Sequence, residues 1–150
     1  MIIGVLGGTG KEGSGLAYRW ALKGHEVIIG SRDANKALAA AGELNRLLTS
    51  KGNVRGASNR EAAQATVVVL TVPYTAQLAT ATDVADVLKG KILVDVTVPL
   101  APPKVDRVQL PNGESAVVAL QRQLGADVKV VSAFQNVSAT HLKDATHDID

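Results

Sequence analysis

The sequence reads GGTGKEG at residues 7–13, directly after the apolar run at residues 1–6 and directly before a helical pattern. It contains G-x-G-x-x-G at Gly8, Gly10 and Gly13. In a strand–turn–helix setting, the first glycine permits a tight turn, the second lets the backbone approach a pyrophosphate, and the third allows close packing of helix on strand. Phosphates then bind at the free N–H groups of the helix. We therefore expect a dinucleotide-binding loop made of Gly8, Thr9, Gly10, Lys11, Glu12 and Gly13.

Outward from this loop, short β-branched runs alternate with helical patterns, which is typical of a parallel sheet covered on both faces. We expect strands at residues 1–6, 26–30, 53–57, 66–72, 91–96 and 127–132, and helical segments at 12–23, 60–64, 77–88 and 115–124. A further helix follows its predicted N-cap Asp33 and carries one apolar stripe: Ala37, Ala41, Leu44 and Leu48. The sequence thus predicts a Rossmann-type α/β fold, doubly wound, with a mainly parallel sheet, as a single domain over residues 1–150.

One long connection stands out between the fifth expected strand and the helix after it. It contains four of the five prolines: Pro99, Pro102, Pro103 and Pro111. Loops of this length without secondary structure are uncommon in compact domains and are often functional.

Composition restricts the classes of function. Hydrophobic residues make up 46% and aromatic residues 3%, so the core must consist of Val, Leu, Ile and Ala. The absence of Cys excludes disulfide scaffolds, Cys-ligated metals and thiol nucleophiles, and it makes a cytoplasmic location the default. Apolar runs are only strand-sized, so we expect neither a membrane span nor a signal peptide. Sixteen Lys and Arg against fourteen Asp and Glu are too balanced for a general nucleic-acid binder.

The end of the second expected strand distinguishes NAD from NADP. NAD binders place an acidic residue there, on the ribose 2′-hydroxyl, whereas this chain has Ser31 and Arg32. A hydroxyl and a guanidinium suit a 2′-phosphate, Lys36 lies one helical turn further on, and Thr9 adds a hydroxyl from the glycine loop. The sequence therefore favours NADP. The alternative interpretation is a solvated Arg and Lys at the start of a surface helix.

Two other enzyme classes and a catalytic side-chain set are disfavoured. The glycines also fit the spacing of short-chain dehydrogenases, but Tyr18 and Tyr74 lack the Lys four residues later that those enzymes use. A P-loop would need G-x-x-x-x-G-K-[ST], which does not occur.

The histidines, His25, His141 and His147, are interpreted as surface residues, and Asp95 as a hydrogen-bonded structural acid. We therefore predict no catalytic side chain and no metal.

Several stretches resemble the NADPH-dependent coenzyme F420 reductases, also called F420H2:NADP oxidoreductases. The most specific are residues 7–10 and GHEVIIGSR at residues 24–32. Residues 71–74, 94–100 and 130–134 extend the likeness over nearly the whole chain. The ferric-reductase domains of a eukaryotic membrane family look similar too.

The resemblance implies an oxidoreductase that transfers a hydride between NADP(H) and the deazaflavin coenzyme F420, a reaction that needs no side-chain nucleophile. It implies that Thr9, Ser31, Arg32 and Lys36 bind the adenosine 2′-phosphate. It also implies that Val72-Pro73 and Val98-Pro99 border the ribose and nicotinamide. Residues 133–139, which begin with Ala133, correspond to the segment that frames the meeting point of nicotinamide and deazaflavin. Some members carry His where this chain has Gln135.

Family members continue beyond the length of this chain, with a C-terminal portion that helps to build the deazaflavin pocket and the dimer. If 150 residues are the whole protein, we expect NADP binding with weakened or lost catalysis. The expected partners are the small-molecule coenzymes, with a homodimer as a possible assembly and no nucleic acid or membrane. Two alternatives stay open: an NADPH-dependent flavin or ferric reductase, and a non-catalytic NADP(H)-binding module.

Overall fold

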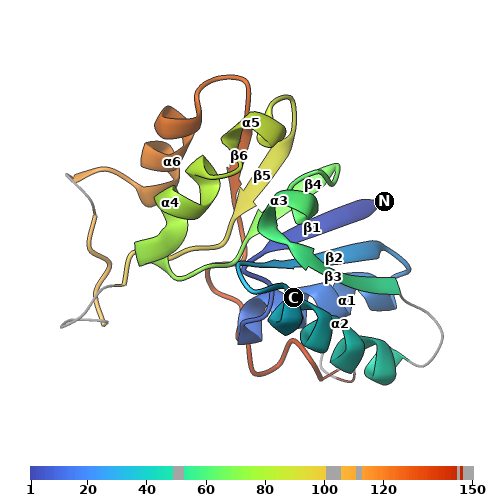
Figure 1. The fold of residues 1–150 in the computed structure, drawn as a ribbon. Coiled ribbons are helices and arrows are strands. Elements are labelled where there is room, and N and C mark those ends of the chain that lie inside the picture. The colour runs from blue at the N-terminus through green and yellow to red at the C-terminus, as the bar shows by residue number, and fades with distance from the viewer. Residues whose placement is uncertain (49–52, 101–105, 111–112, 145, 147–150) are drawn as a thin grey trace.

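The computed structural model describes residues 1–48, 53–100, 106–110, 113–144 and 146. Within them, six parallel strands form a sheet in the order β3-β2-β1-β4-β5-β6 (Figure 1). The strands are β1 (Ile2–Leu6), β2 (Glu26–Ser31), β3 (Asn53–Ser58), β4 (Val67–Leu70), β5 (Ile92–Asp95) and β6 (Lys129–Ser132). The order reverses between β1 and β4, which leaves a crevice at the carboxyl ends of these two strands. The predicted Rossmann-type α/β fold is confirmed.

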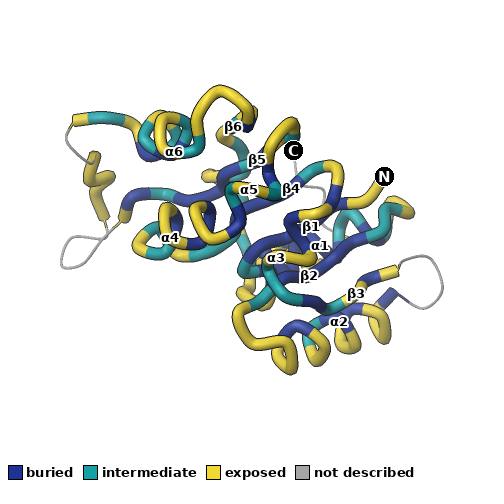
Figure 2. The backbone as a smooth tube through the Cα atoms, turned by 45° about the horizontal axis from the view of Figure 1, so that its top comes forward, coloured by how far each residue is buried: buried dark blue, intermediate teal, exposed yellow. Residues whose placement is uncertain are grey.

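Helices cover both faces of the sheet, because neighbouring residues of a strand point to opposite sides. The helices are α1 (Lys11–Leu22), α2 (Ala34–Leu48), α3 (Asn59–Ala62), the 3-10 turn η1 (Tyr74–Ala76), α4 (Gln77–Thr82), α5 (Ala85–Leu88) and α6 (Ala116–Leu124). Val27 and Ile29 of β2 belong to the core beneath α1 and α2, whereas Ile28 belongs to the core beneath α3, α4, α5 and α6. Figure 2 shows the central strands as the most continuously buried part of the chain.

The details of α2 agree with the prediction. Its apolar stripe is buried along its whole length: Ala37, Ala41, Leu44 and Leu48. Asp33 caps the helix, because its Oδ1 accepts hydrogen bonds from the backbone N–H groups of Asn35 at 3.0 Å and Lys36 at 3.4 Å. A cap in this position fixes where β2 ends and the helix begins. It therefore also fixes the placement of Ser31 and Arg32.

The single helix predicted over residues 77–88 is wrong. The chain forms α4 and α5, which are separated at Asp83 and Val84, and the backbone of Val84 is non-helical with φ −122° and ψ 11°. Thr, Asp and Val are weak helix formers. In addition, the guanidinium of Arg60 binds the carbonyl of Asp83 and the carboxylate of Asp86, which ties the break to α3. The apolar spacing runs through the break, so periodicity could not reveal it.

After β6 the chain returns to the side of the sheet that carries α1 and α2 (Figure 1). Leu142 is buried there against Gly15, where a Cβ would lie 2.5 Å from the Cβ of Leu142. The Nε of Arg19 donates to the carbonyl of Leu142 at 2.7 Å. Trp20 and Phe134 meet edge to face with 6.0 Å between ring centroids. These contacts join the C-terminal segment to the first helix, and Trp20 packs against the core through them.

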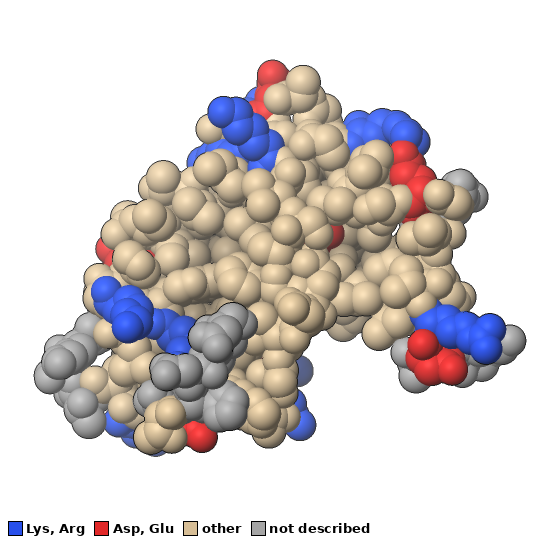
Figure 3. All heavy atoms as spheres, turned by 180° about the vertical axis from the view of Figure 1, so that it is seen from behind, with Lys and Arg blue, Asp and Glu red and all other residues tan. Residues whose placement is uncertain are grey.

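Charged side chains are dispersed over the surface. On the face seen in Figure 3, Lys and Arg lie in separate groups near the edges and are interspersed with Asp and Glu. None of the helices in the described ranges is both long enough and apolar enough to cross a membrane. Predictions concerning Pro102, Pro103, Pro111 and His147 fall outside the described residues.

Candidate functional site

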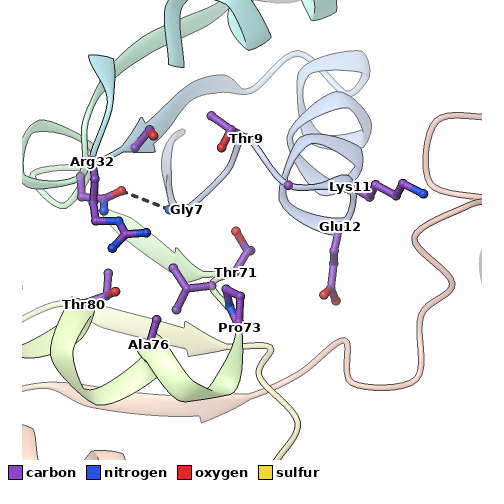
Figure 4. A pocket seen from close by; sticks show the side chains of 13 residues that line it. Gly7, Thr9, Lys11, Glu12, Arg32, Thr71, Pro73, Ala76 and Thr80 are labelled. Atoms are coloured by element: carbon purple, nitrogen blue, oxygen red, sulfur yellow. Dashed lines mark hydrogen bonds between the residues drawn. The ribbon is translucent and has the colours of Figure 1, made fainter. Parts of the chain in front are cut away.

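A cleft of about 440 Å³ opens at the carboxyl ends of β1, β2 and β4. It lies where the strand order reverses, which is where open α/β sheets bind their ligands. Figure 4 shows side chains from the glycine turn, from the end of β2 and from the segment after β4 converging on it. The lining residues are Gly7, Thr9, Gly10, Lys11, Glu12, Ser31, Arg32, Asn59, Thr71, Val72, Pro73, Ala76 and Thr80.

The glycine turn is held in place by its neighbours. The N–H of Gly7 donates to Oδ1 of Asn59 at 3.1 Å, and the N–H of Gly8 donates to the carbonyl of Gly30 at 3.0 Å. Gly7 has φ +69°, and a Cβ there would lie 2.4 Å from Cγ1 of Val72. Gly7 is thus the residue whose left-handed backbone makes the tight turn, a role that we expected Gly8 to have. The N–H of Gly8 pins the turn to β2.

Gly13 and Gly10 have different roles. A Cβ on Gly13 would lie 2.4 Å from Oγ1 of Thr71 and 2.8 Å from Cα of Gly8, so only glycine lets α1 approach β4 this closely. A Cβ on Gly10 would meet nothing nearer than the carbonyl oxygen of Gly7 at 3.9 Å. Gly10 is also the N-cap of α1 and offers no capping side chain. The N-terminus of α1, with its partial positive charge, therefore borders open space.

The end of β2 forms one side of the cleft. Oγ of Ser31 accepts a hydrogen bond from the N–H of Asp33 at 3.1 Å. Arg32 is exposed, and in Figure 4 its side chain extends toward the space between the glycine turn and α4. Thr9 lines the same cleft. Lys36 is exposed and is not among the lining residues, so the structure does not bring it to the cleft with the other three.

The remaining predicted residues fall into two groups. Lys11, Glu12, Val72 and Pro73 line the cleft, although the Lys11 side chain points away from the other lining residues in Figure 4. Val98 and Pro99 instead border a separate cavity of about 170 Å³, which Thr97, Ser132 and Gln135 also line. Ala133 lines neither cavity, and its N–H donates to the carbonyl of Asp95 at 3.2 Å.

Five lining residues were not among the predicted site residues: Gly7, Asn59, Thr71, Ala76 and Thr80. Gly7 has a local sequence signal because it opens the GGTGKEG run, although the expected motif began at Gly8. Asn59 has one because it lies inside the capping box formed by Ser58 and Glu61, whose side chains bind each other's backbone N–H at 3.2 and 3.0 Å. This box places Asn59 at the start of α3, facing the N–H of Gly7. Thr71, Ala76 and Thr80 reach the cleft through the tertiary fold alone.

A buried polar cluster lies at the end of β5. Nε2 of Gln77 donates to Oδ2 of Asp95 at 2.6 Å and to Oγ1 of Thr97 at 2.8 Å, while the N–H of Thr97 donates to Oδ1 of Asp95 at 3.1 Å. Gln77 and Asp95 are each only 1% exposed. Burial raises the pKa of the Asp95 carboxyl, and the hydrogen bonds from Thr97 and Gln77 oppose this rise. Asp95 is therefore hydrogen-bonded, as we predicted, and it joins α4 to the strand that leads into Val98.

Comparison with known proteins identifies the family. The family described as "NADP oxidoreductase coenzyme F420-dependent" matches residues 2–99. The chain belongs to this family. It is 46% identical to the F420-dependent NADP reductase of Methanothermobacter marburgensis over 156 aligned positions, which cover all of this chain and 70% of that protein. The corresponding protein of Methanothermobacter thermautotrophicus is 41% identical, with 67% of its length covered.

A solved structure agrees with this assignment. The crystal structure of a protein assigned as an F420-dependent NADP reductase from Arthrobacter has a TM-score of 0.75 and 33% sequence identity. The match covers 93% of this chain and 64% of that protein. The chain thus spans about two thirds of the length of these relatives. The predicted family resemblance is confirmed.

The Asp95 cluster yields a stability prediction. Replacing Gln77 by Leu removes a donor to a buried carboxylate, so we expect the free energy of unfolding in urea to fall by about 1–3 kcal/mol at neutral pH. Burial raises the pKa of Asp95 above its value in the unfolded chain, so protonation favours the folded state. The Gln77 amide favours the charged carboxylate, so its loss matters less once Asp95 is protonated. The loss of unfolding free energy should therefore shrink as the pH falls through the pKa of Asp95. Gln64→Leu, at an exposed position, is the matched control. An equal deficit at all pH values would show that Gln77 does not act on the carboxylate.

Proposed function

We propose that the cleft binds NADP(H) and that the protein transfers a hydride between NADP(H) and coenzyme F420. The observation that carries the nucleotide assignment is the end of β2, where Ser31 and Arg32 line the cleft together with Thr9. A guanidinium and two hydroxyls suit the 2′-phosphate that distinguishes NADP from NAD. Membership of the F420-dependent family supports the second coenzyme.

The glycine turn fits a pyrophosphate. Gly10 leaves room where any other residue would place a Cβ, and the N-terminus of α1 supplies partial positive charge at that point. Gly8 and Gly13 contribute from behind the cleft, by letting the turn and the helix pack closely enough. Lys11 adds a cation at the first turn of α1. Lys36 is exposed on α2 outside the lining of the cleft, and we propose that its long side chain reaches the 2′-phosphate from there.

The β4 side of the cleft suits the other half of the nucleotide. Val72 and Pro73 present an apolar edge there, and we propose that they border the ribose and nicotinamide. Val98, Pro99 and Ala133, at the ends of β5 and β6, are proposed to frame the space where the two coenzymes meet. When bound, the reduced nicotinamide supplies a hydride that the deazaflavin accepts. The side chains hold the reactants in line and exclude water, which contributes about 7–11 kcal/mol to lowering such barriers.

The organisation of the protein follows from this proposal. Residues 1–150 are proposed to act as a single NADP-binding domain with no catalytic side chain or metal. A cytoplasmic location is supported by the absence of cysteine. The homodimer stays a prediction of the family resemblance, which light scattering would test.

The activity is tested by mixing the protein with NADPH and oxidised F420 and following the absorbance of the deazaflavin at about 420 nm. We expect the absorbance to fall with F420 as acceptor and not with free flavin or ferric chelates. Reduction of flavin or ferric iron instead would favour the alternative reductase. Tight NADP binding without turnover on any acceptor would favour a binding module.

Replacing Arg32 by Ala tests the nucleotide assignment. Charged hydrogen bonds contribute about 1.5–3 kcal/mol, so the Kd for NADP measured by calorimetry should rise about ten- to a hundredfold. The Kd for NAD serves as the internal control and should barely change, because NAD has no 2′-phosphate. Equal weakening for both nucleotides would contradict the role given to Arg32.

A pair of glycine variants separates folding from binding. Gly10→Ala adds a Cβ in open space on an extended backbone, so we expect unchanged thermal stability but weaker NADP binding, because the methyl group enters the pyrophosphate site. Gly13→Ala places its Cβ against Thr71 and Gly8, so stability and binding should both fall. Undiminished NADP affinity in Gly10→Ala would place the pyrophosphate elsewhere.

A further inference from the structure

Glu12 is an unusual residue for an anion-binding cleft. It lies in the first turn of α1, is half-buried and lines the cleft. Within the described ranges, no hydrogen bond or ion pair engages its carboxylate. Burial raises the pKa of Glu12. The partial positive charge of the helix N-terminus favours an acidic side chain in the first turn, and from this position the carboxylate acts on the charge of whatever the cleft binds.

The position of Glu12 relative to Arg32 defines which part of a nucleotide it faces. In Figure 4 the two side chains lie far apart, with the glycine turn and the Thr71–Pro73 segment between them. With the 2′-phosphate at Arg32 and the pyrophosphate at the backbone N-terminus of α1, the nicotinamide half is proposed to lie beside Val72 and Pro73. In Figure 4 the Glu12 side chain extends from the first turn of α1 to the side of the cleft where Pro73 lies. This step rests on the proposed function.

The nicotinamide ring differs in charge between the two redox states. It carries a positive charge in NADP⁺ and none in NADPH, whereas the phosphates of the two forms are the same. A carboxylate near the ring therefore attracts the oxidised form more than the reduced form, while its repulsion of the phosphates is common to both. Among the described residues that line the cleft, only Glu12 has an acidic side chain.

We infer that Glu12 determines the redox-state preference of this site, by stabilising bound NADP⁺ relative to bound NADPH. Linkage between binding and reduction gives this preference a consequence for the reaction. Tighter binding of NADP⁺ makes bound NADPH a stronger hydride donor, so Glu12 favours transfer from NADPH to the acceptor on the protein. The hydride leaves the nicotinamide with its electron pair, and the ring that remains is the cation that Glu12 faces.

The test compares Glu12→Gln with the wild-type protein by calorimetry at constant ionic strength, at a pH above the pKa of Glu12. The ligands are NADP⁺, NADPH and adenosine 2′,5′-bisphosphate, which has no nicotinamide. We expect the ratio of the Kd for NADP⁺ to the Kd for NADPH to rise about three- to tenfold in Glu12→Gln. The matched control is Glu26→Gln, the same change at the first residue of β2. Glu26 lies at the amino end of this strand, whereas the cleft lies at the carboxyl ends of the strands. This control should leave the ratio unchanged.

A pH series provides a second readout. As the pH falls through the raised pKa of Glu12, the wild-type ratio should approach that of Glu12→Gln, and the variant itself should show no such change. Lys11 and Arg32 are the other charged side chains that line this cleft, and both are retained in the variant. The variant therefore serves as the reference for any effect of these two groups.

The possible outcomes are distinct. An unchanged ratio in Glu12→Gln overturns the inference, and so does equal tightening of all three ligands, because Glu12 would then only repel phosphate. Binding of the bisphosphate by the variant shows that the variant is folded. If the wild-type protein binds none of the three ligands, the proposed function itself fails.

Discussion

The close packing of the glycine turn against three neighbouring strands is the constraint on which the site depends. Gly8 is hydrogen-bonded to the end of β2, Gly7 to Asn59 after β3, and Gly13 lies against Thr71 after β4. These contacts aim the N-terminus of α1 at the crevice formed by the reversal of strand order. A Cβ at Gly7 or Gly13 would be within 2.4 Å of a side chain, so the turn can reach this position only with glycine.

The charges around this turn are arranged from one end of the cleft to the other. Arg32 lies at the end of β2, the helix N-terminus is central, and Glu12 lies at the far side (Figure 4). Beyond the cleft, the buried cluster of Asp95, Gln77 and Thr97 joins α4 to the end of β5. An ordered series of cation, partial positive charge and anion matches a ligand that is anionic along most of its length and cationic at one end.

Much of the fold and of the cleft could be predicted, because short stretches of sequence determine the strands, the glycine turn and the end of β2. Short β-branched runs specify buried parallel strands, and the spacing of Gly8, Gly10 and Gly13 specifies the packing of α1 on the sheet. Asp33 was identified as a cap because its side chain binds backbone groups only two and three residues away. Ser31 ends β2 and Arg32 directly follows it, so the predicted position of this strand was enough to place both residues at the cleft.

The features that sequence reasoning missed depend on contacts between distant parts of the chain. Thr71 and Thr80 enter the cleft because β4 lies beside β1, which no local pattern records. The break between α4 and α5 is fixed by Arg60, more than twenty residues earlier. Val98 and Pro99 were expected beside Val72 and Pro73, yet they border a separate cavity, since each segment follows a different strand.

The central claim is that the end of β2 and the glycine turn together hold a 2′-phosphorylated dinucleotide. A crystal structure of the protein with NADP⁺ tests it most directly. The account predicts 2′-phosphate oxygens within hydrogen-bond distance of the Ser31 hydroxyl and the Arg32 guanidinium, with the pyrophosphate at the N-terminus of α1. A nucleotide whose 2′-phosphate points into solvent, or one that is bound away from the glycine turn, would contradict it.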